Sequence, residues 1–564
     1  MKNLLQTSDY IVLAAYFVLV GLYGWWIYIK KRNKEVAASK DFFLAEGQLT
    51  WWAIGASLIA SNISAEQMTG MSGSGFYLGL AISSYEWMAA LTLIIVAVFF
   101  MPVYLKNKIY TMPQFLHQRY NSRVAMIMAV FWLLLYIVVN LLSILYLGGV
   151  AIAGITGWDF TMCVLLLAIF SVIIALGGMK VVGYTSAIQV FFLVFSGILG
   201  LYIALNMISG DAGILKGFSI LRKEVPQHFH MIFDKSNPNY IDLPGLSVLI
   251  GGMWIANLNY WGCNQYITQR ALGASLPVAR KGILFAAFLK MLMPVIIVVP
   301  GIAIYYLYQH NMIDRSLIDI TKDGVLVADN NKTYPTLLQL LPDGIKGVTV
   351  AAFAATVISS LAAKVNSIGT IFTLDIYKKT FEKEAAERKL VNVGKVSIII
   401  STIIGIILTL ALGDALMGEG KQGFQYIQEY TGFVSPGIFA MFLLGFFWKK
   451  TTSNAALFAI IGGFVFSVLL KFLPGMINLE SLNAIGFAVM NKEGVFEIPF
   501  LDRMAIVFLL SVAGMIVISL YENAKGIVPN GLEVDTKMFK TSTSFAIGSL
   551  IIIGLLIALY TAFY

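Results

Sequence analysis

Long apolar runs follow one another along most of this chain of 564 residues. A helix that crosses the hydrocarbon core of a bilayer needs about 20 apolar residues, and runs of this length recur about fourteen times. Inside lipid every backbone amide and carbonyl must find its partner within the protein, so such runs form membrane-spanning helices. The sequence therefore predicts an all-α polytopic membrane protein with about fourteen transmembrane helices. The predicted spans lie approximately at 8–29, 50–73, 78–104, 123–156, 160–179, 184–208, 244–270, 279–308, 344–378, 389–414, 421–448, 453–473, 501–521 and 542–563.

The amino-acid composition agrees with this class of protein. Hydrophobic residues make up 59% of the chain, charged residues make up 12%, and the mean hydropathy is +0.81. A soluble protein carries about 25% charged residues. The net charge of +9 comes from short basic clusters between the apolar runs, which is typical of cytoplasmic loops and excludes a nucleic-acid partner. Cys163 and Cys263 lie inside apolar runs, so neither a disulfide framework nor a thiolate metal site is expected.

The basic clusters also predict the orientation of the chain. The first apolar run is followed by Lys30-Lys31-Arg32, whereas a signal peptide is preceded by its basic residues. We therefore expect an uncleaved first helix with the N-terminus outside and every basic cluster on the cytoplasmic side. Both termini then lie outside, together with the longer connections 209–243, 309–343 and 474–500.

The second apolar run is interrupted by polar side chains. It contains the sequence Ser61-Asn62-Ile63-Ser64-Ala65-Glu66-Gln67 and continues through Met71 toward a further run at Gly79. Carboxyl, amide and hydroxyl groups are costly in lipid, because no water is present to satisfy them. Such groups persist where they face a cavity or a partner, so they mark a functional site inside the membrane. The sequence predicts that something polar passes through the protein here.

A second interruption lies five spans later, in the run Gly251-Gly252-Met253-Trp254-Ile255-Ala256-Asn257-Leu258-Asn259-Tyr260-Trp261. Its glycines and asparagines predict an unwound helix at mid-depth. Two broken helices at corresponding positions of two five-helix halves indicate inverted-repeat transporters, and this pattern favours them over a bundle without repeats. The expected segments are an extra helix and cytoplasmic loop at 1–49, the first repeat with its outer loop at 50–243, the second repeat at 244–452, and C-terminal helices at 453–564.

Several polar residues in the predicted spans suit a polyhydroxylated substrate. A sugar presents hydroxyls that donate and accept, and an apolar face that an aromatic ring can cover. An ordinary interhelical hydrogen bond is the alternative for each single amide. Glu86 and Lys290 are harder to explain in that way, because isolated charges are costly in a membrane, but they can form a structural ion pair. The candidates are Asn62, Gln67, Glu86, Asn257, Tyr260, Lys290, Gln425 and Gln428.

A sodium ion requires about five oxygen ligands, because the ion is hard and weakly polarising. Ser359 and Ser360 offer two hydroxyls on one helix, and carbonyls freed near Ala60 and Ile63 by the first broken helix can supply further ligands. Serine hydroxyls in membrane helices also donate hydrogen bonds to carbonyls of their own helix. The serine pair by itself is therefore compatible with such internal hydrogen bonds as well as with a sodium site.

Four long stretches of the chain are distinctive: Trp51-Trp52-Ala53-Ile54-Gly55-Ala56-Ser57-Leu58-Ile59-Ala60 through Ser74-Gly75, Ser84-Tyr85-Glu86-Trp87-Met88, Trp254 through Gln265-Tyr266, and Phe424 through Pro436-Gly437. These stretches resemble the sodium/solute symporter family, especially its bacterial sodium/galactose members, and the similarity covers nearly the whole chain.

This resemblance implies a leucine-transporter-type fold of fourteen helices with alternating access, one helix before the 5+5 inverted repeat and three after it. It implies a hexose substrate (galactose or glucose), one coupling sodium ion, no organic cofactor, and a bacterial inner membrane; it leaves the oligomeric state open. Sugar-binding residues of the family match Asn62, Gln67, Glu86, Asn257, Tyr260, Lys290 and Gln428. Gate residues match Met71, Tyr85 and Phe424 on the outer side, with Tyr260 and Trp261. Sodium ligands match the carbonyls of Ala60, Ile63 and Thr356 and the hydroxyls of Ser359 and Ser360.

The chain departs from the family pattern at three positions. Ala89 replaces a serine near the binding glutamate, which removes one hydroxyl contact. Ser186 replaces an aspartate that is associated with the sodium exit route, and it cannot supply that charge. Lys364 replaces an apolar residue one turn beyond Ser360. We expect its side chain to extend outward along a water-filled exit; alternatively its ammonium occupies or repels the cation site.

The leading functional hypothesis is secondary active uptake of a hexose coupled to inward sodium. The alternative is an ion-independent or proton-linked carrier of a sugar or other polyol, in which Lys364 alters the cation site. A membrane enzyme is disfavoured, because the sequence contains no H-E-x-x-H, G-x-S-x-G or Walker motif. A receptor that binds sugar without moving it is a further alternative, and the absence of a signalling domain after the last span disfavours it.

Overall fold

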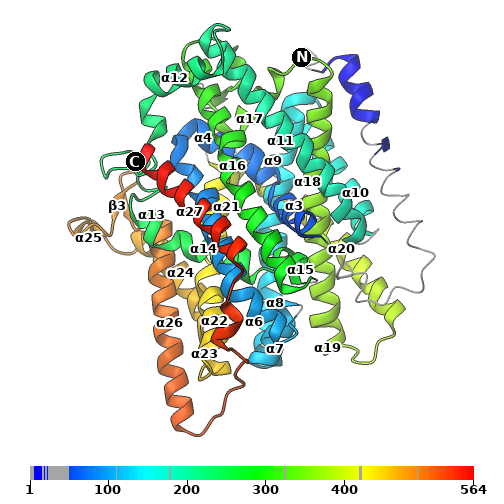
Figure 1. Ribbon diagram of the computed structural model, residues 1–564, viewed down its shortest axis with the longest axis vertical. Coiled ribbons are helices and arrows are strands. Elements are labelled where there is room, and N and C mark those ends of the chain that lie inside the picture. The colour runs from blue at the N-terminus through cyan, green and yellow to red at the C-terminus, as the bar shows by residue number, and fades with distance from the viewer. Residues whose placement is uncertain are drawn as a thin grey trace.

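A computed structural model gives the structure of this chain. It describes residues 5–15, 18, 19, 22, 50–109, 111–176, 179–272, 274–322, 325–417, 422–491 and 493–564, and for residues 179–189, 266, 269 and 322 the backbone alone. Nearly all elements in this part are helices, and many of them run along the long axis of the molecule (Figure 1). The prediction of an all-α protein is confirmed; strands occur in two short hairpins between helices.

All regular elements in the first half of the described chain are helices. Its elements are α3 (Trp51–Asn62), η1 (Glu66–Met71), α4 (Ser72–Leu78), η2 (Gly79–Ser83), α5 (Ser84–Ile95), η3 (Val96–Phe100), α6 (Met101–Lys106), α7 (Met112–Arg119), α8 (Ser122–Leu134), η4 (Leu135–Leu141), α9 (Leu142–Thr156), α10 (Phe160–Leu176), α11 (Met179–Ser209), α12 (Ile214–Glu224) and η5 (Pro226–Phe229).

The middle of the chain contains the second broken helix and the first hairpin. Its elements are α13 (Ser247–Ile250), α14 (Gly252–Cys263), α15 (Gln265–Leu272), α16 (Leu276–Gln309), η6 (Arg315–Leu317), β1 (Asp319–Lys322), β2 (Val325–Ala328), η7 (Asn330–Lys332), α17 (Thr333–Gln339), α18 (Ile345–Thr370), η8 (Ile371–Tyr377), α19 (Lys378–Thr380), α20 (Glu387–Met417), α21 (Gly423–Thr431) and α22 (Ser435–Phe447). Strands β1 and β2 pair antiparallel, with Asp319 opposite Ala328.

The C-terminal part adds helices at one side of the molecule. Its elements are α23 (Ser453–Leu457), η9 (Phe458–Gly462), α24 (Gly463–Phe472), η10 (Leu473–Gly475), α25 (Glu480–Asn483), β3 (Val489–Met490), β4 (Phe496–Glu497), α26 (Phe500–Ala524), η11 (Thr536–Phe539) and α27 (Thr543–Ala562). Strands β3 and β4 form the second antiparallel hairpin, with Val489 opposite Glu497.

Within the described residues, nine helices are long and apolar enough to cross a membrane, and the pair α21 and α22, bent by 48°, passes the same test together. Further predicted spans fall on shorter or broken helices such as α3 and α14. The count of about fourteen crossings and the division into segments 1–49, 50–243, 244–452 and 453–564 stay predictions. Half of the span at 8–29 and the cluster Lys30-Lys31-Arg32 lie outside the described residues.

The break predicted in the second span is confirmed. Helix α3 ends at Asn62, Ile63 is extended (φ −67°, ψ 113°), and the helix resumes as η1 at Glu66. The Ser64 hydroxyl accepts a hydrogen bond from the Glu66 backbone N–H (3.2 Å). In a continuous α-helix this N–H would donate to the carbonyl four residues earlier, so Ser64 offers it a different partner. The local sequence thus stabilises the interruption at the depth where the polar side chains lie.

The break predicted in the seventh span is confirmed at Gly251, the first residue of the predicted stretch, but the prediction that the helix unwinds at Asn257 and Asn259 is wrong. The chain breaks at Gly251 and again at Asn264 (φ −98°, ψ 126°), and α14 between them is continuous. The amide of Asn257 donates to the carbonyl of Met253 on its own helix (3.2 Å), which is compatible with an intact helix. Gly252 allows close packing, because an added Cβ would lie 2.2 Å from the carbonyl oxygen of Leu501 on α26.

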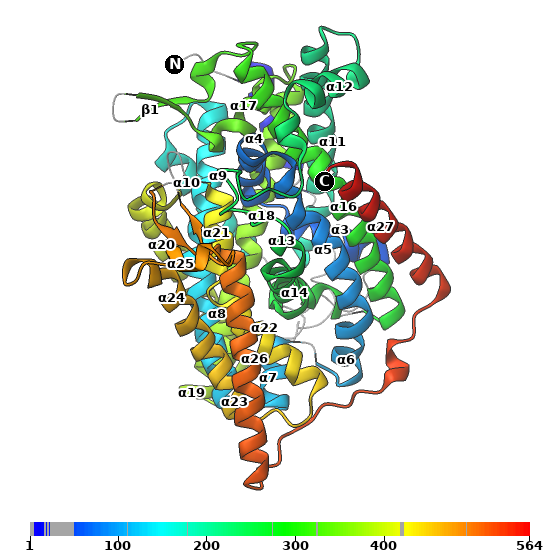
Figure 2. The ribbon, with the colours of Figure 1, turned by 90° about the vertical axis from the view of Figure 1, so that its left-hand side faces the viewer.

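The two ends of the molecule carry different kinds of segments (Figures 1 and 2). The upper end in Figure 1 carries the long connections with α12 and α17, and the lower end carries α7, α19 and α23. The basic pairs at 378–379 and 449–450 are on α19 and just before α23. Residues 5–15 are held in the upper half, because the Asp9 carboxylate accepts the backbone N–H groups of Gly344 (2.7 Å) and Gly347 (2.9 Å) at the start of α18.

Candidate functional site

A cavity lies in the middle of the molecule, where the broken helix α3–η1 faces α5, α14, α16 and α21. Its volume is about 90 Å³, enough for roughly six or more water molecules. Of the eight candidates for substrate binding, Gln425 is not part of this lining, and seven are: Asn62, Gln67, Glu86, Asn257, Tyr260, Lys290 and Gln428. These residues come from five separate helical segments, so the fold brings together what the sequence places far apart.

Lys290 and Glu86 form an ion pair at the wall of this cavity. The Lys290 Nζ atom lies 2.5 Å from Glu86 Oε2, and the two side chains are 1% and 2% exposed. The same ammonium donates to Asn62 Oδ1 and lies 5.2 Å above the ring of Trp261. Burying two charges is costly unless they are paired and hydrogen-bonded, and here each charge has partners. The ion-pair alternative considered from the sequence is therefore correct, and both members also line the cavity.

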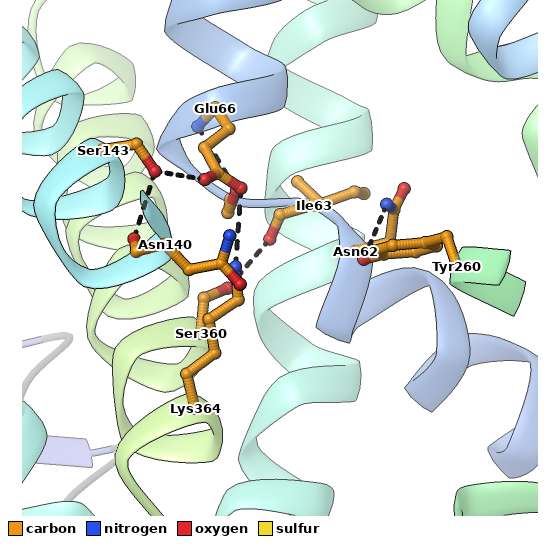
Figure 3. Close-up of polar contacts among 9 residues, drawn as sticks. Asn62, Ile63, Glu66, Asn140, Ser143, Tyr260, Ser360 and Lys364 are labelled. Carbon is orange, nitrogen blue, oxygen red and sulfur yellow. Dashed lines mark hydrogen bonds and ion pairs between the residues drawn. The ribbon is translucent and has the colours of Figure 1, made fainter. Parts of the chain in front are cut away.

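Asn62 links this ion pair to the second broken helix. Its side-chain oxygen accepts from Lys290, and its Nδ2 donates to the hydroxyl of Tyr260 at 3.1 Å (Figure 3). The resulting chain of contacts joins α3, α5, α14 and α16 through polar atoms. A carboxylate, an ammonium, an amide and a phenol offer both acceptors and donors, which is the chemistry that hydroxyl groups of a ligand require.

The predicted outer gate is partly assembled. The rings of Tyr85 and Phe424 meet edge to face, with centroids 5.1 Å apart, and Tyr85 donates to Gln425 Oε1 at 3.1 Å. Both rings are buried and line the cavity, as do Tyr260 and Trp261. Met71 is also fully buried, at the end of η1, but does not contribute to the lining. The gating roles of these residues stay predictions.

The predicted cation ligands lie where the break in the first helix faces α18. The Ser360 hydroxyl donates to the carbonyl of Ile63 at 3.2 Å (Figure 3), so a ligand from each element is already in contact. Ala60 and Ser359 are buried on the same two helices. The hydroxyl of Thr356 donates to Ala352 within α18 (2.8 Å), which leaves its carbonyl as the predicted ligand. Hydroxyl and carbonyl oxygens are the donor set that a hard monovalent cation prefers.

Lys364 does not extend outward, and that expectation is wrong. Its ammonium lies 3.6 Å from Glu66 Oε2, and the lysine is 3% exposed. A long cationic side chain reaches water when no buried anion is near. Here a buried carboxylate is within reach across the gap between η1 and α18, and the ion pair replaces exposure to water.

Some cavity residues were not singled out from the sequence. Asn140, Asn259 and Asn264 line the cavity, and Asn264 accepts a hydrogen bond from Tyr136 (2.5 Å). Asn140 is the only amide in a long apolar run and lies in η4, a π-helical turn of the kind often found at functional sites. That isolated polar residue was the available signal. Ala89 also lines the cavity, whereas the side chain of Ser186 lies outside the described residues.

The comparison with known families decides the class of this protein. The model of the sodium:solute symporter family matches residues 42–463. The chain belongs to this family. It is a membrane transporter of the symporter class, which is not a class of enzymes.

Relatives within the family cover most or all of the chain. A sodium/glucose cotransporter of Vibrio parahaemolyticus is 45% identical over 563 residues, which is 99% of each protein. The human sodium/myo-inositol cotransporter 2 is 32% identical over 488 residues, which is 81% of this chain and 69% of the human protein. As in other sodium:solute symporters, sodium is the coupling ion of this class.

A solved structure supports the fold. The substrate-bound outward-open state of a Na⁺-coupled sialic acid symporter superimposes with a TM-score of 0.72 at 20% sequence identity, over 92% of this chain and 98% of that chain. The predicted leucine-transporter-type architecture is thereby confirmed.

Proposed function

We propose that this symporter carries a hexose, galactose or glucose, into the cell together with sodium by alternating access. The observation that carries the proposal is the buried network of Tyr260, Asn62, Lys290 and Glu86 at the wall of a central cavity. The names of the two relatives support it, because glucose and myo-inositol are both neutral compounds with several hydroxyl groups. A sugar can exchange hydrogen bonds with the same donors and acceptors.

Recognition of the sugar rests on hydrogen bonds that a wrong epimer leaves unmade. A buried polar group without its partner costs about 1–3 kcal/mol, which exceeds the loss of one methylene contact. In this proposal Gln67, Asn257 and Gln428 complete the set of polar contacts, and the ring of Tyr260 covers the apolar face of the pyranose. Discrimination among hexoses then depends on the amides more than on the size of the cavity.

One sodium ion is proposed at the contact of the first broken helix with α18. Its ligands would be the carbonyls of Ala60, Ile63 and Thr356 and the hydroxyls of Ser359 and Ser360. The ion would join the segment that carries Asn62 to α18 and so favour the sugar-binding arrangement. Binding of sodium and sugar is then coupled in both directions, as linkage requires.

The upper end in Figure 1 is proposed to face outward and the lower end to face the cytoplasm of a bacterial cell, with both termini outside. The positive-inside rule supports this orientation, because the basic pairs of α19 and of the turn before α23 lie at the lower end. The contact of Tyr85 with Phe424 then acts as the outer lid.

The available driving force is sufficient for accumulation. One positive charge that crosses 100 mV releases about 2.3 kcal/mol. A tenfold sodium gradient adds about 1.4 kcal/mol. Together they could support a sugar ratio of roughly several hundredfold.

Uptake of radiolabelled D-galactose and D-glucose into proteoliposomes, with and without an inward sodium gradient, tests the proposal. Accumulation of either sugar above its equilibrium level, abolished by collapse of the gradient, is expected. A competitor panel that includes myo-inositol and sialic acid identifies the preferred substrate. Equal uptake with and without sodium would contradict the coupling, and lack of transport of any hexose would contradict the substrate class.

Replacing Ser360 by alanine should weaken sodium binding. The change removes one hydroxyl ligand and its contact with the Ile63 carbonyl while leaving the helix intact. A lost hydrogen bond of this kind costs about 1 kcal/mol, so the half-saturating sodium concentration should rise roughly fivefold or more. Sodium titration of uptake at fixed sugar measures it. Ser367→Ala on the same helix, whose hydroxyl bonds to Ala363 (3.0 Å), is the matched control.

A further inference from the structure

A second buried ion pair lies beside the proposed cation site. Lys364 Nζ is 3.6 Å from Glu66 Oε2, with side chains that are 4% and 12% exposed (Figure 3). The carboxylate also accepts hydrogen bonds from Ser143 (2.5 Å) and Ser64 (3.3 Å). These hydroxyls are neutral, so Lys364 supplies positive charge against the charge of Glu66.

The two members of this pair come from the same two elements as the proposed sodium ligands. Glu66 begins η1, three residues after Ile63, and Lys364 lies on α18, four residues after Ser360. Residues four apart on a helix lie on the same face, one turn from each other. The pair therefore connects the broken helix to α18 next to the contact between Ser360 and Ile63. A bound sodium ion would connect these elements in the same way.

The charges of this pair act directly on a cation bound next to them. A carboxylate one turn away attracts sodium, and an ammonium at a similar distance repels it. In a buried site the effect of one unit charge at about 6 Å corresponds to roughly a hundredfold in affinity when the effective dielectric constant is about 20. Since Lys364 and Glu66 carry opposite charges, their effects on sodium largely cancel.

We propose that Lys364 determines the sodium affinity of this symporter, as a tethered cation that neutralises Glu66. The inference rests on the proposed function in one respect, the location of the sodium site. Without the ammonium, the carboxylate would be a strong attractor beside the ligands, and sodium would bind tightly. With it, sodium binds more weakly, and the carrier operates at high sodium concentrations.

Four versions of the full-length protein test the role of charge. The wild type has the neutral pair, Lys364→Met leaves one negative charge, Glu66→Gln leaves one positive charge, and the double variant has neither. We expect the half-saturating concentration of ²²Na⁺ binding to purified protein to fall at least tenfold in Lys364→Met and to rise at least tenfold in Glu66→Gln. The double variant should stay within about threefold of the wild type.

Lys346→Met is the matched control. Lys346 is on the same helix and pairs with Asp343 at 3.7 Å, but it lies eighteen residues away, about 27 Å along the axis. A charge at this distance is expected to leave sodium binding unchanged. Monodisperse elution and a retained thermal transition establish that each variant is folded.

The pattern of shifts decides the outcome. Equal sodium affinity in all folded versions would overturn the inference. A shift of sodium affinity in the same direction in both single variants would also overturn it, because the effect of a structural disturbance does not depend on the sign of the charge that is removed. If Lys364→Met does not fold, the comparison of Glu66→Gln with the neutral double variant still tests the role of charge. Glu66→Gln, which keeps the positive charge of Lys364, should bind sodium more weakly than the double variant. Equal sodium affinity of these two variants would overturn the inference. D-Galactose uptake is measured separately: an intact sodium series without hexose uptake would overturn the proposed substrate alone.

Discussion

Sugar uptake should fall to background when Lys290 is replaced by alanine, while the protein still inserts into the membrane. The substitution leaves the Glu86 carboxylate buried without its ion-pair partner and removes the donor that orients Asn62. Loss of one member of a buried ion pair typically costs about 3–5 kcal/mol. If this cost falls on the sugar-bound state, the apparent affinity decreases by a factor of roughly 100 or more. Radiolabelled hexose uptake in proteoliposomes with equal amounts of protein measures the loss.

A second substitution separates stability from transport. In the double variant Glu86→Ala/Lys290→Ala no unpaired charge remains, so thermal stability should partly recover while uptake stays absent. Gln67→Ala should abolish uptake as well, because Gln67 lines the cavity between the two broken helices. Near-normal transport by both Lys290→Ala and Gln67→Ala would remove the proposed sugar site.

Replacing Arg119 by leucine should strongly destabilise the protein. This guanidinium is 1% exposed and donates to the carbonyls of Gly445 (2.7 Å), Thr451 (3.0 Å) and Trp448 (3.0 Å). These carbonyls lie at and beyond the C-terminal end of α22, where a helix lacks its own donors. Each buried acceptor left without a partner costs about 1–3 kcal/mol, so the total approaches 3–5 kcal/mol.

Thermal unfolding in detergent, followed by size-exclusion chromatography, measures this effect. The melting temperature should be lower by several degrees, and the yield of monodisperse protein should decrease. Arg123→Leu, an exposed arginine on the next helix, is the matched control and should behave as the wild type. Equal stability of the two variants would show that water satisfies the carbonyls when Arg119 is absent.

The first broken helix was predictable because its signal is local. The polar cluster at 61–67 is too costly to face lipid, and Ser64 offers Glu66 a hydrogen bond within the same segment. The extent of the second break was wrongly predicted for the opposite reason. Gly252 resembles a helix breaker in the sequence, but here it accommodates Leu501, a contact that depends on another helix 249 residues away along the chain (501 − 252).

Partners of buried charges depend on tertiary structure even where the charges themselves are conspicuous. Glu86 and Lys290 are separated by 204 residues and meet because α5 and α16 pack side by side. For Lys364 the sequence favoured an exposed end, and only the position of η1 against α18 brings Glu66 within reach. Asn140 was missed because a single amide in an apolar run is compatible with any interhelical hydrogen bond.

By itself the sequence determined that this protein is a helical membrane transporter, and it indicated many of the polar residues at its centre. The physical reason is that lipid cannot form hydrogen bonds with polar groups. The length and hydropathy of each span, and every polar residue that interrupts it, are therefore constrained by the local sequence. Only the tertiary structure decided how far the second break extends and which charged side chains form ion pairs with each other. Those outcomes depend on distances of a few ångströms between segments far apart in the chain, because electrostatic and hydrogen-bond energies change steeply over such distances.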